Sequence, residues 1–171
     1  MSSSETAEKL PTRVLVAAGE GESWAVAAWL DEGGGVDAHY AELKGVTLLL
    51  AASAGGQEAM VRMLLQRGAS IDLQNPFGIT ALMHAATIGH TTTVQVLLDA
   101  KADASLQGID GSTALMMAEQ EKHTETAQLL RQHAKRQTAE AKAAVIHAAA
   151  TAPTPNLSGR RVRIFDLKPK P

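Results

Sequence analysis

The sequence predicts an all-α protein: a solenoid of stacked helix-turn-helix units with a long C-terminal helix. Three observations predict it. Gly-x-Thr triplets begin at Gly45, Gly78 and Gly111, a constant interval of 33 residues, and a fixed period of this length is typical of repeat proteins. Hydrophobic residues make up 45% of the chain but aromatic residues only 3%, which favours closely packed helices over a β-sandwich. Each helical stretch is also too short to be stable by itself in water, so neighbouring units must stabilise one another by stacking.

Further positions repeat within each unit and define its first helix. A leucine follows the threonine by two residues, and an alanine follows it by five. Stacking is expected to bury the leucines as one continuous ridge, and the small alanines let the helix axes approach closely. The threonine hydroxyls are expected to cap the first helices, and a glycine or, in the last unit, Lys122 is expected to end them. These positions are Leu49, Leu82 and Leu115; Ala52, Ala85 and Ala118; Thr47, Thr80 and Thr113; and Gly56 and Gly89.

The three units resemble ankyrin repeats, whose pattern G-x-T-P-L-H-x-A-A-x-x-G-H leads into an amphipathic stretch that ends L-L-L-x-x-G-A-D. The run GITALMHAATIGH from Gly78 to His90 follows this pattern closely. The proline and the first histidine of the pattern are replaced by residues that a helix tolerates. The resemblance therefore implies the family's fold without its usual threonine–histidine hydrogen bond. The replacements are Leu48, Ala81 and Ala114 for the proline, and Leu50, Met83 and Met116 for the histidine.

The second histidine of the pattern is kept at His90 and His123. The resemblance implies that each imidazole binds backbone groups of the neighbouring loop. The six histidines of the chain do not show metal-ligand spacing, so we expect no metal site. A neutral imidazole at this position predicts that stability falls below about pH 6.

A degenerate unit precedes the three regular ones, and the loop from Val36 to Gly45 carries a two-residue insertion. We expect a disordered N-terminus over residues 1–10 and a repeat domain over 11–134, followed by a helix extension over 135–150 that projects from the stack. Residues 151–171 begin with a proline-broken linker and continue into a segment that resembles the first strand of an SH3-like barrel. The expected repeat units are residues 11–42, 43–75, 76–108 and 109–134.

The sequence does not argue for an enzyme. The segment Val14–Ser23 lacks the third glycine of a dinucleotide-binding loop and the Lys-Ser of a P-loop, and the repeat explains its glycines as a helix turn. A Ser-His-Asp arrangement is not readable, and we expect no cofactor; a catalytic domain beyond Pro171 is left open. The chain has no cysteine and no recognisable signal peptide or membrane-spanning run. We therefore expect a monomeric intracellular protein in the cytoplasm, with a nuclear location left open.

The ankyrin resemblance implies a protein–protein interaction module, an adaptor or scaffold, that binds a partner of unknown identity on its concave face. In this family the face is formed by the loop tips and by the exposed side of each first helix. The middle unit is apolar there, and clustered exposed apolar residues mark interaction sites; the alternative is that Phe77 folds back onto the loop of Tyr40. Carried over by position, the partner-binding residues are Lys44, Val46, Pro76, Phe77, Ile79, Thr87, Ile88, Ile109, Asp110, Ser112, Gln120 and Glu121.

Charge is unevenly distributed along the chain. Residues 131–171 contain nine Lys and Arg against two Asp and Glu, a net charge of +7, whereas residues 1–130 contain seven against sixteen, a net charge of −9. The alternative function is therefore a nucleic-acid- or membrane-associated protein that binds through its basic C-terminal segment, with the repeats regulatory. Only Phe165 could stack on a base in that segment, so direct nucleic-acid binding is the less favoured form of this alternative.

Overall fold

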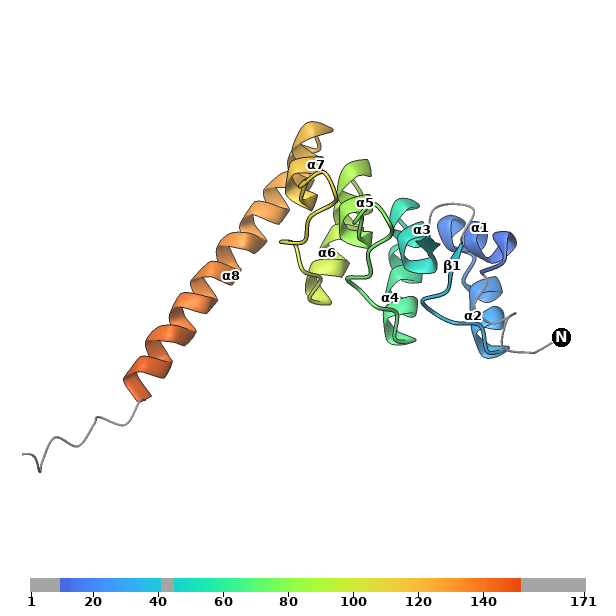
Figure 1. Ribbon diagram of the computed structural model, residues 1–171, viewed down its shortest axis with the longest axis horizontal. Helices are drawn as coiled ribbons and strands as arrows, with labels where there is room; N and C mark the ends of the chain where they lie inside the picture. Colours follow the sequence, from blue (N-terminus) through green and yellow to red (C-terminus); the bar gives the residue numbers. More distant parts are fainter. Residues whose placement is uncertain (1–9, 41–44, 152–171) are drawn as a thin grey trace, which may run out of the picture. The chain divides into compact units, whose positions relative to one another are not determined.

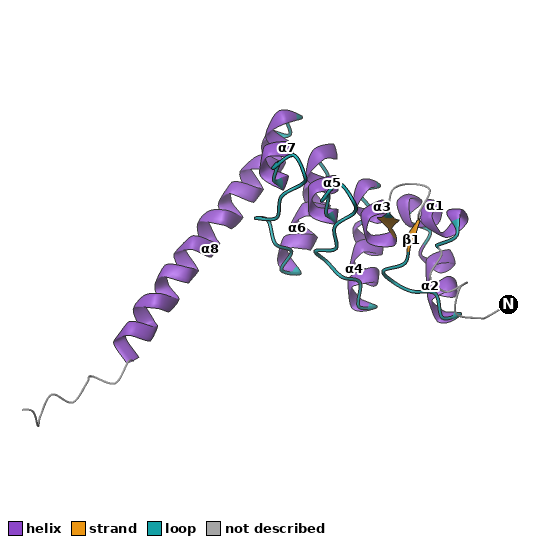
Figure 2. Ribbon diagram, viewed as in Figure 1, coloured by secondary structure: helices purple, strands orange, loops and turns teal. Residues whose placement is uncertain are grey.

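The computed structural model of the chain describes residues 10–40 and 45–151, with side chains up to residue 145. The chain divides into two compact parts, residues 1–136 and 137–171, and each is considered by itself. The described residues form eight helices and two short strands (Figures 1 and 2), which confirms the all-α prediction. The elements are α1 (Thr12–Glu20), α2 (Ser23–Asp31), β1 (His39–Tyr40), β2 (Val46–Thr47), α3 (Leu48–Ala54), α4 (Glu58–Gln66), α5 (Ala81–Ile88), α6 (Thr91–Asp99), α7 (Ala114–Gln120) and α8 (Thr124–Thr151).

The helices of the first part stack as two rows. Helices α1, α3, α5 and α7 form one row in which each helix contacts the next, and α2, α4 and α6 lie along a second row (Figure 1). Each unit pairs one helix from each row, and α8 begins in the second-helix position of the last unit. The loops between units run from the second row back to the first (Figure 2). This arrangement explains how helices of seven to nine residues remain stable, because each helix packs on at least one neighbouring unit.

The buried ridge follows the repeated leucines and alanines. Leu49 and Leu82 are each 2% exposed, and the three repeated alanines are completely buried. Leu115 is half-buried, and Met116 is 52% exposed although its counterparts Leu50 and Met83 are each 1% exposed. This difference arises because, among the described residues, α7 has a preceding unit to pack on but no following one.

The repeated threonines cap the first helices, as the sequence predicts. The hydroxyl oxygen of Thr47 accepts a hydrogen bond from the Leu50 backbone N–H at 3.3 Å. Thr80 accepts from Met83 at 3.3 Å, and Thr113 accepts from Met116 at 3.4 Å. Each cap satisfies a backbone N–H that would have no partner within the helix, which typically contributes about 1 kcal/mol.

The degenerate first unit folds as a helix-turn-helix. Gly21, with a φ of 81°, separates α1 from α2, so the glycine-containing segment is a turn of the repeat and not a phosphate loop. The insertion that follows is part of a short antiparallel hairpin, in which His39 lies opposite Thr47 and Tyr40 opposite Val46. The Tyr40 ring is buried, and its hydroxyl accepts a hydrogen bond from the Thr12 hydroxyl at 2.9 Å, which connects the hairpin to α1.

The long C-terminal helix is present where the sequence predicts it. Its buried residues in the first part are Thr126, Ala127 and Leu130, and an exposed ion pair joins Arg131 to Glu119 of α7 at 2.7 Å. In the second part, residues 137–145 of the helix are exposed. The expected linker and SH3-like strand lie beyond Thr151, outside the described residues. Among the residues that are described, the helices are too short or too polar to cross a bilayer.

Candidate protein-binding surface

In the second, third and fourth units, a side chain at the start of the second helix reaches back to the preceding unit. Gln57 donates from Nε2 to the carbonyl oxygen of Gly19 at 3.1 Å. His90 and His123 lie at the corresponding position, and their Nε2 atoms bond the carbonyl oxygens of Ala54 and Thr87, each at 3.0 Å. A carbonyl oxygen only accepts, so Nε2 must carry the proton in both imidazoles. We call these three contacts the inter-unit latches, and they confirm the structural role that the family resemblance implied for the histidines.

Each latch side chain also packs against a glycine. A Cβ atom built on Gly56 would lie 2.7 Å from Nδ1 of His90, and one built on Gly89 would lie 2.5 Å from Nδ1 of His123. Both glycines have a positive φ, 68° and 85°. Two properties of glycine are therefore needed at these positions. It adopts the left-handed backbone that ends the first helix, and it leaves the space that the next unit's imidazole fills.

The latches hold the helical side of the predicted surface in place. Their acceptors, Gly19, Ala54 and Thr87, lie at the ends of α1, α3 and α5, and Thr87 is one of the predicted partner-binding residues. Thr87 is held further because its hydroxyl donates to the Met83 carbonyl at 2.8 Å. The helix ends are thus positioned by the fold before any partner binds.

The loop tips are connected by a second set of hydrogen bonds. The backbone N–H of Ile109 donates to the carbonyl oxygen of Phe77 at 3.0 Å, which joins the tips of the third and fourth units. Within the third tip, Asn75 Oδ1 accepts from the N–H groups of Phe77 and Ile79, both at 3.0 Å. Gln74 Nε2 donates to the carbonyls of Gly78 at 2.8 Å and Gln107 at 3.0 Å, spanning the same two units. Sequence reasoning missed Gln57, Gln74 and Asn75; only the 33-residue register could have pointed to them.

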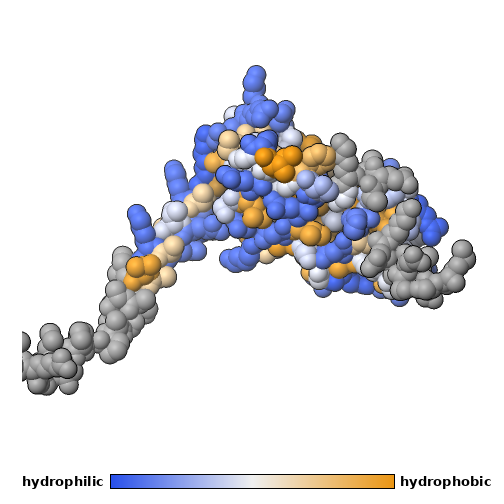
Figure 3. All heavy atoms as spheres, in the orientation of Figure 1, coloured by the Kyte–Doolittle hydropathy of each residue, from blue (hydrophilic) through white to orange (hydrophobic). Residues whose placement is uncertain are grey.

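Three large apolar side chains remain exposed on this surface. Phe77 is 37% exposed, Ile88 44% and Ile109 75%. We call these three residues the apolar patch. Figure 3 shows strongly hydrophobic side chains among hydrophilic ones on the face in view, over the region of α5 and α7.

The other predicted site residues differ in exposure. Pro76, Asp110, Gln120 and Glu121 are exposed, whereas Thr87 and Ser112 are half-buried. Val46 and Ile79 are half-buried and pack on the hydrophobic core. Lys44 lies outside the described residues.

The polar tip of the fourth unit holds its carboxylate in the charged form. Asp110 accepts hydrogen bonds from the Ser112 backbone N–H at 3.0 Å and from the Ser112 hydroxyl at 2.9 Å. Because these bonds favour the ionised carboxylate, they lower the pKa of Asp110 below its ordinary value. This tip therefore presents a negative charge directly beside Ile109.

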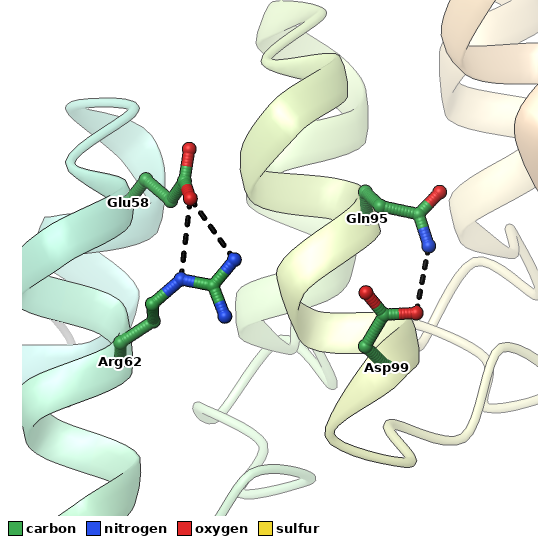
Figure 4. Close-up of polar contacts among 4 residues, drawn as sticks. All are labelled: Glu58, Arg62, Gln95 and Asp99. Carbon is green, nitrogen blue, oxygen red and sulfur yellow. Dashed lines mark hydrogen bonds and ion pairs between the residues drawn. The ribbon is translucent and has the colours of Figure 1, made fainter.

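The outer face of the stack has a different chemistry. On α4, Glu58 pairs with Arg62 at 3.0 Å, and on α6, Gln95 donates to Asp99 at 2.7 Å (Figure 4). These exposed groups interact within their own helix, one turn apart. Among the described residues, His, Asp and Glu do not come together in a group of three that could hold a metal ion.

Repeated helix pairs, stacked in two rows and tied by one latch per boundary, define a helical-repeat solenoid. A family model of ankyrin repeats, three copies long, matches residues 14–107 and again residues 48–142. The chain therefore belongs to the ankyrin-repeat family, whose members are generally protein–protein interaction modules and typically non-catalytic. A comparison with curated proteins found no match.

Proposed function

We propose that this chain is a non-catalytic adaptor or scaffold segment that binds a partner protein on the surface formed by its loop tips and by the ends of its first helices. The observation that carries the proposal is the apolar patch: Phe77, Ile88 and Ile109 are exposed on a surface whose backbone is hydrogen-bonded from unit to unit. Exposed apolar clusters on a monomer commonly mark interaction sites.

Rigidity of the surface strengthens the argument. A surface that needs no ordering on binding loses less conformational entropy, so more of its contact energy appears as affinity. Aromatic side chains are enriched in protein interfaces, and a few central residues often contribute most of the binding energy. Phe77 combines both properties, because Asn75 and Ile109 hold its backbone while more than a third of its side chain is exposed.

The proposal is tested by identifying the partner and then measuring its affinity for matched variants. Affinity capture with residues 1–150 and with the full chain, followed by mass spectrometry, supplies the partner. Phe77→Ala and Ile109→Ala are then compared with Trp24→Ala, because Trp24 on α2 is 75% exposed like Ile109 but lies outside the proposed surface.

We expect the two surface variants to weaken binding by about 1–2 kcal/mol each, roughly fivefold to thirtyfold in Kd, with the melting temperature lowered by only a few degrees. Trp24→Ala should bind normally. A large loss of stability in Phe77→Ala with unchanged affinity would identify Phe77 as a core residue and refute its role in binding.

The charge distribution favours one alternative. With nine Lys and Arg against two acids, residues 131–171 could bind nucleic acid or an anionic membrane while the repeats regulate that binding. This alternative predicts a strong loss of binding between about 50 and 200 mM salt. It also predicts that residues 1–150 lose most of the affinity of the full chain, whereas binding through the apolar patch would survive both changes.

A further inference from the structure

The described segments of the proposed surface carry charge of one sign. They comprise the tips at residues 45–46, 76–79 and 109–112 and the helix ends at 19–20, 54–55, 87–88 and 120–121. Three carboxylates lie on these described segments, Glu20, Asp110 and Glu121, and all three are exposed. The same segments contain no Lys, Arg or His. Two lysines adjoin these segments in the sequence: Lys44, which precedes Gly45 and lies outside the described residues, and Lys122, which follows Glu121.

Three arginines of the described repeats form ion pairs outside the proposed surface. Arg62 pairs with Glu58 on the outer face, and Arg67 pairs with Asp31 at the boundary of the first two units. Arg131 pairs with Glu119. In the described part of the chain, Glu20, Asp110 and Glu121 are not members of an ion pair. Their charges are therefore available to an incoming molecule.

The charges and the apolar patch follow an order along the stack. Glu20 marks the first unit, and the apolar residues Phe77 and Ile88 mark the third. The fourth unit presents Ile109, the third residue of the apolar patch, next to Asp110 in its tip, and Glu121 at its helix end. A segment that crosses the units thus meets a carboxylate, then small residues, then apolar side chains, and then carboxylates.

The second unit leaves the backbone uncovered at this surface. Its helix end is Ala54-Gly55, and a Cβ on Gly55 would lie 2.0 Å from the carbonyl oxygen of Gly19. A side chain cannot be accommodated there without moving α1, so the approach of α1 and α3 depends on glycine. Gly55 itself is exposed, so at this point the surface presents backbone and not a side chain between the two charged regions.

We propose that the partner is a protein segment whose hydrophobic side chains are flanked by Lys or Arg. The hydrophobic side chains pack on Phe77, Ile88 and Ile109, and the cations lie against Asp110 and Glu121 at one end and Glu20 at the other. The net charge of −9 over residues 1–130 attracts such a segment from a distance and repels acidic polymers, nucleic acid among them. This inference rests on the proposed function, because it assigns the chemistry of the partner to the same surface.

The test is a selection of displayed random peptides against the full chain, followed by affinity measurements on the selected peptides. Binders that lose affinity for Phe77→Ala are kept, since they occupy the proposed surface. Their composition is then compared with that of the unselected library. We expect Lys and Arg to be enriched beside apolar residues, and Asp and Glu to be depleted.

Charge variants of the protein complete the test. The double variant Asp110→Asn with Glu121→Gln should weaken the selected peptides by about threefold to tenfold and reduce the salt dependence of binding. Asp99→Asn is the matched control, because it removes one carboxylate from the outer face and keeps an acceptor for Gln95 (Figure 4). Binding to the control should be unchanged.

The outcomes separate this inference from the proposed function. Binders that depend on Phe77 but show no basic enrichment, or that bind the double variant and the parent equally, overturn the charge assignment and leave the surface itself intact. Binders that ignore both Phe77→Ala and Ile109→Ala, or a selection that yields no binder, count against the proposed function as well. A preference for acidic peptides or for single-stranded nucleic acid on this surface would contradict the inference directly.

Discussion

His123 bonds the carbonyl oxygen of Thr87 through Nε2 at 3.0 Å while its Nδ1 edge lies against Gly89. One side chain of the fourth unit therefore holds both the surface end and the turn of the third. Gln57 makes the same pair of contacts with Gly19 and Gly21 in the first unit. The latch thus needs a side-chain donor long enough to reach the carbonyl oxygen of the preceding unit while it packs on a glycine. An amide can do this as well as an imidazole.

Replacing His123 by alanine should destabilise the stack. The Thr87 carbonyl would lose its partner and the Gly89 turn its packing, so we expect the free energy of unfolding to fall by about 1–3 kcal/mol. His123→Gln should restore most of the loss, because glutamine performs this role at position 57. Urea denaturation of the full chain measures both variants. Equal stability of His123→Ala and the parent would show that the latch contributes nothing.

The turn glycines supply a second test. Gly89→Ala combines a φ of 85° with a Cβ placed 2.5 Å from the His123 ring, and we expect a loss of about 2 kcal/mol or more. Lys122 occupies the corresponding turn of the last unit with a φ of 61°. A side chain is tolerated at position 122 because, among the described residues, no imidazole from a following unit packs against this turn.

Lys122→Gly is the matched change in the opposite direction. It removes left-handed strain that costs roughly 1–2 kcal/mol for a residue with a Cβ, partly offset by the greater freedom of glycine in the unfolded chain. We expect a net gain of about 0.5 kcal/mol in urea denaturation. A gain for Gly89→Ala, or a loss for Lys122→Gly, would show that the two turns do not share this geometry.

The repeat made most of the fold predictable. A 33-residue period places Leu49 and Leu82 in the ridge, Thr80 at a helix cap and Gly89 in a left-handed turn, because stacking imposes the same environment at each equivalent position. The period does not predict the partial exposure of Leu115, which arises because the last unit lacks a following neighbour among the described residues. Periodicity describes the interior of a stack better than its ends.

The candidate surface was less predictable for the same reason. Stacking constrains the residues that pack between units but not those on the surface. The period therefore located the loop tips but did not predict the exposure of each side chain. Ile79 was predicted to face the partner with Phe77, yet it packs on the core while Phe77 is exposed. Residues two apart would share a face in an extended segment, but the chain turns here, and Asn75 holds the turn by accepting from both N–H groups. This pair of hydrogen bonds depends on the geometry of the loop tip, which the spacing of residues in the sequence does not reveal.

Stability should depend on pH through His84 in α5. Burial disfavours the charged imidazole and lowers the pKa of His84 from its ordinary value near 6.5. The unfolded chain therefore binds the proton at a higher pH than the folded chain does. As the pH falls through the unfolded value toward the lower folded one, stability should decrease, and it should be fully retained above that window.

His84→Met isolates this contribution, because Met117 occupies the corresponding position in the fourth unit. Melting temperatures at about pH 7.5 and pH 5 should differ less for the variant than for the parent. An identical pH dependence in His84→Met and the parent would show that His84 does not contribute to the pH dependence of stability.

Two hydroxyls in the second unit should respond to alanine in opposite directions. Ser53 is completely buried in α3, and among the described residues its Oγ has no hydrogen-bond partner. An unpaired buried hydroxyl is unfavourable by about 1–3 kcal/mol, and the corresponding residues Ala18 and Ala86 already lack one. We therefore expect Ser53→Ala to raise the free energy of unfolding by about 1 kcal/mol.

Thr47→Ala is the control, because it removes a hydroxyl that caps the same helix. Loss of the cap should lower the free energy of unfolding by about 1 kcal/mol, so the two variants should differ by roughly 2 kcal/mol in urea denaturation although each deletes one buried hydroxyl. The sign of each change then depends on whether the oxygen has a donor to satisfy. If both variants were destabilised to the same extent, Ser53 would have to contribute an interaction that its burial does not account for.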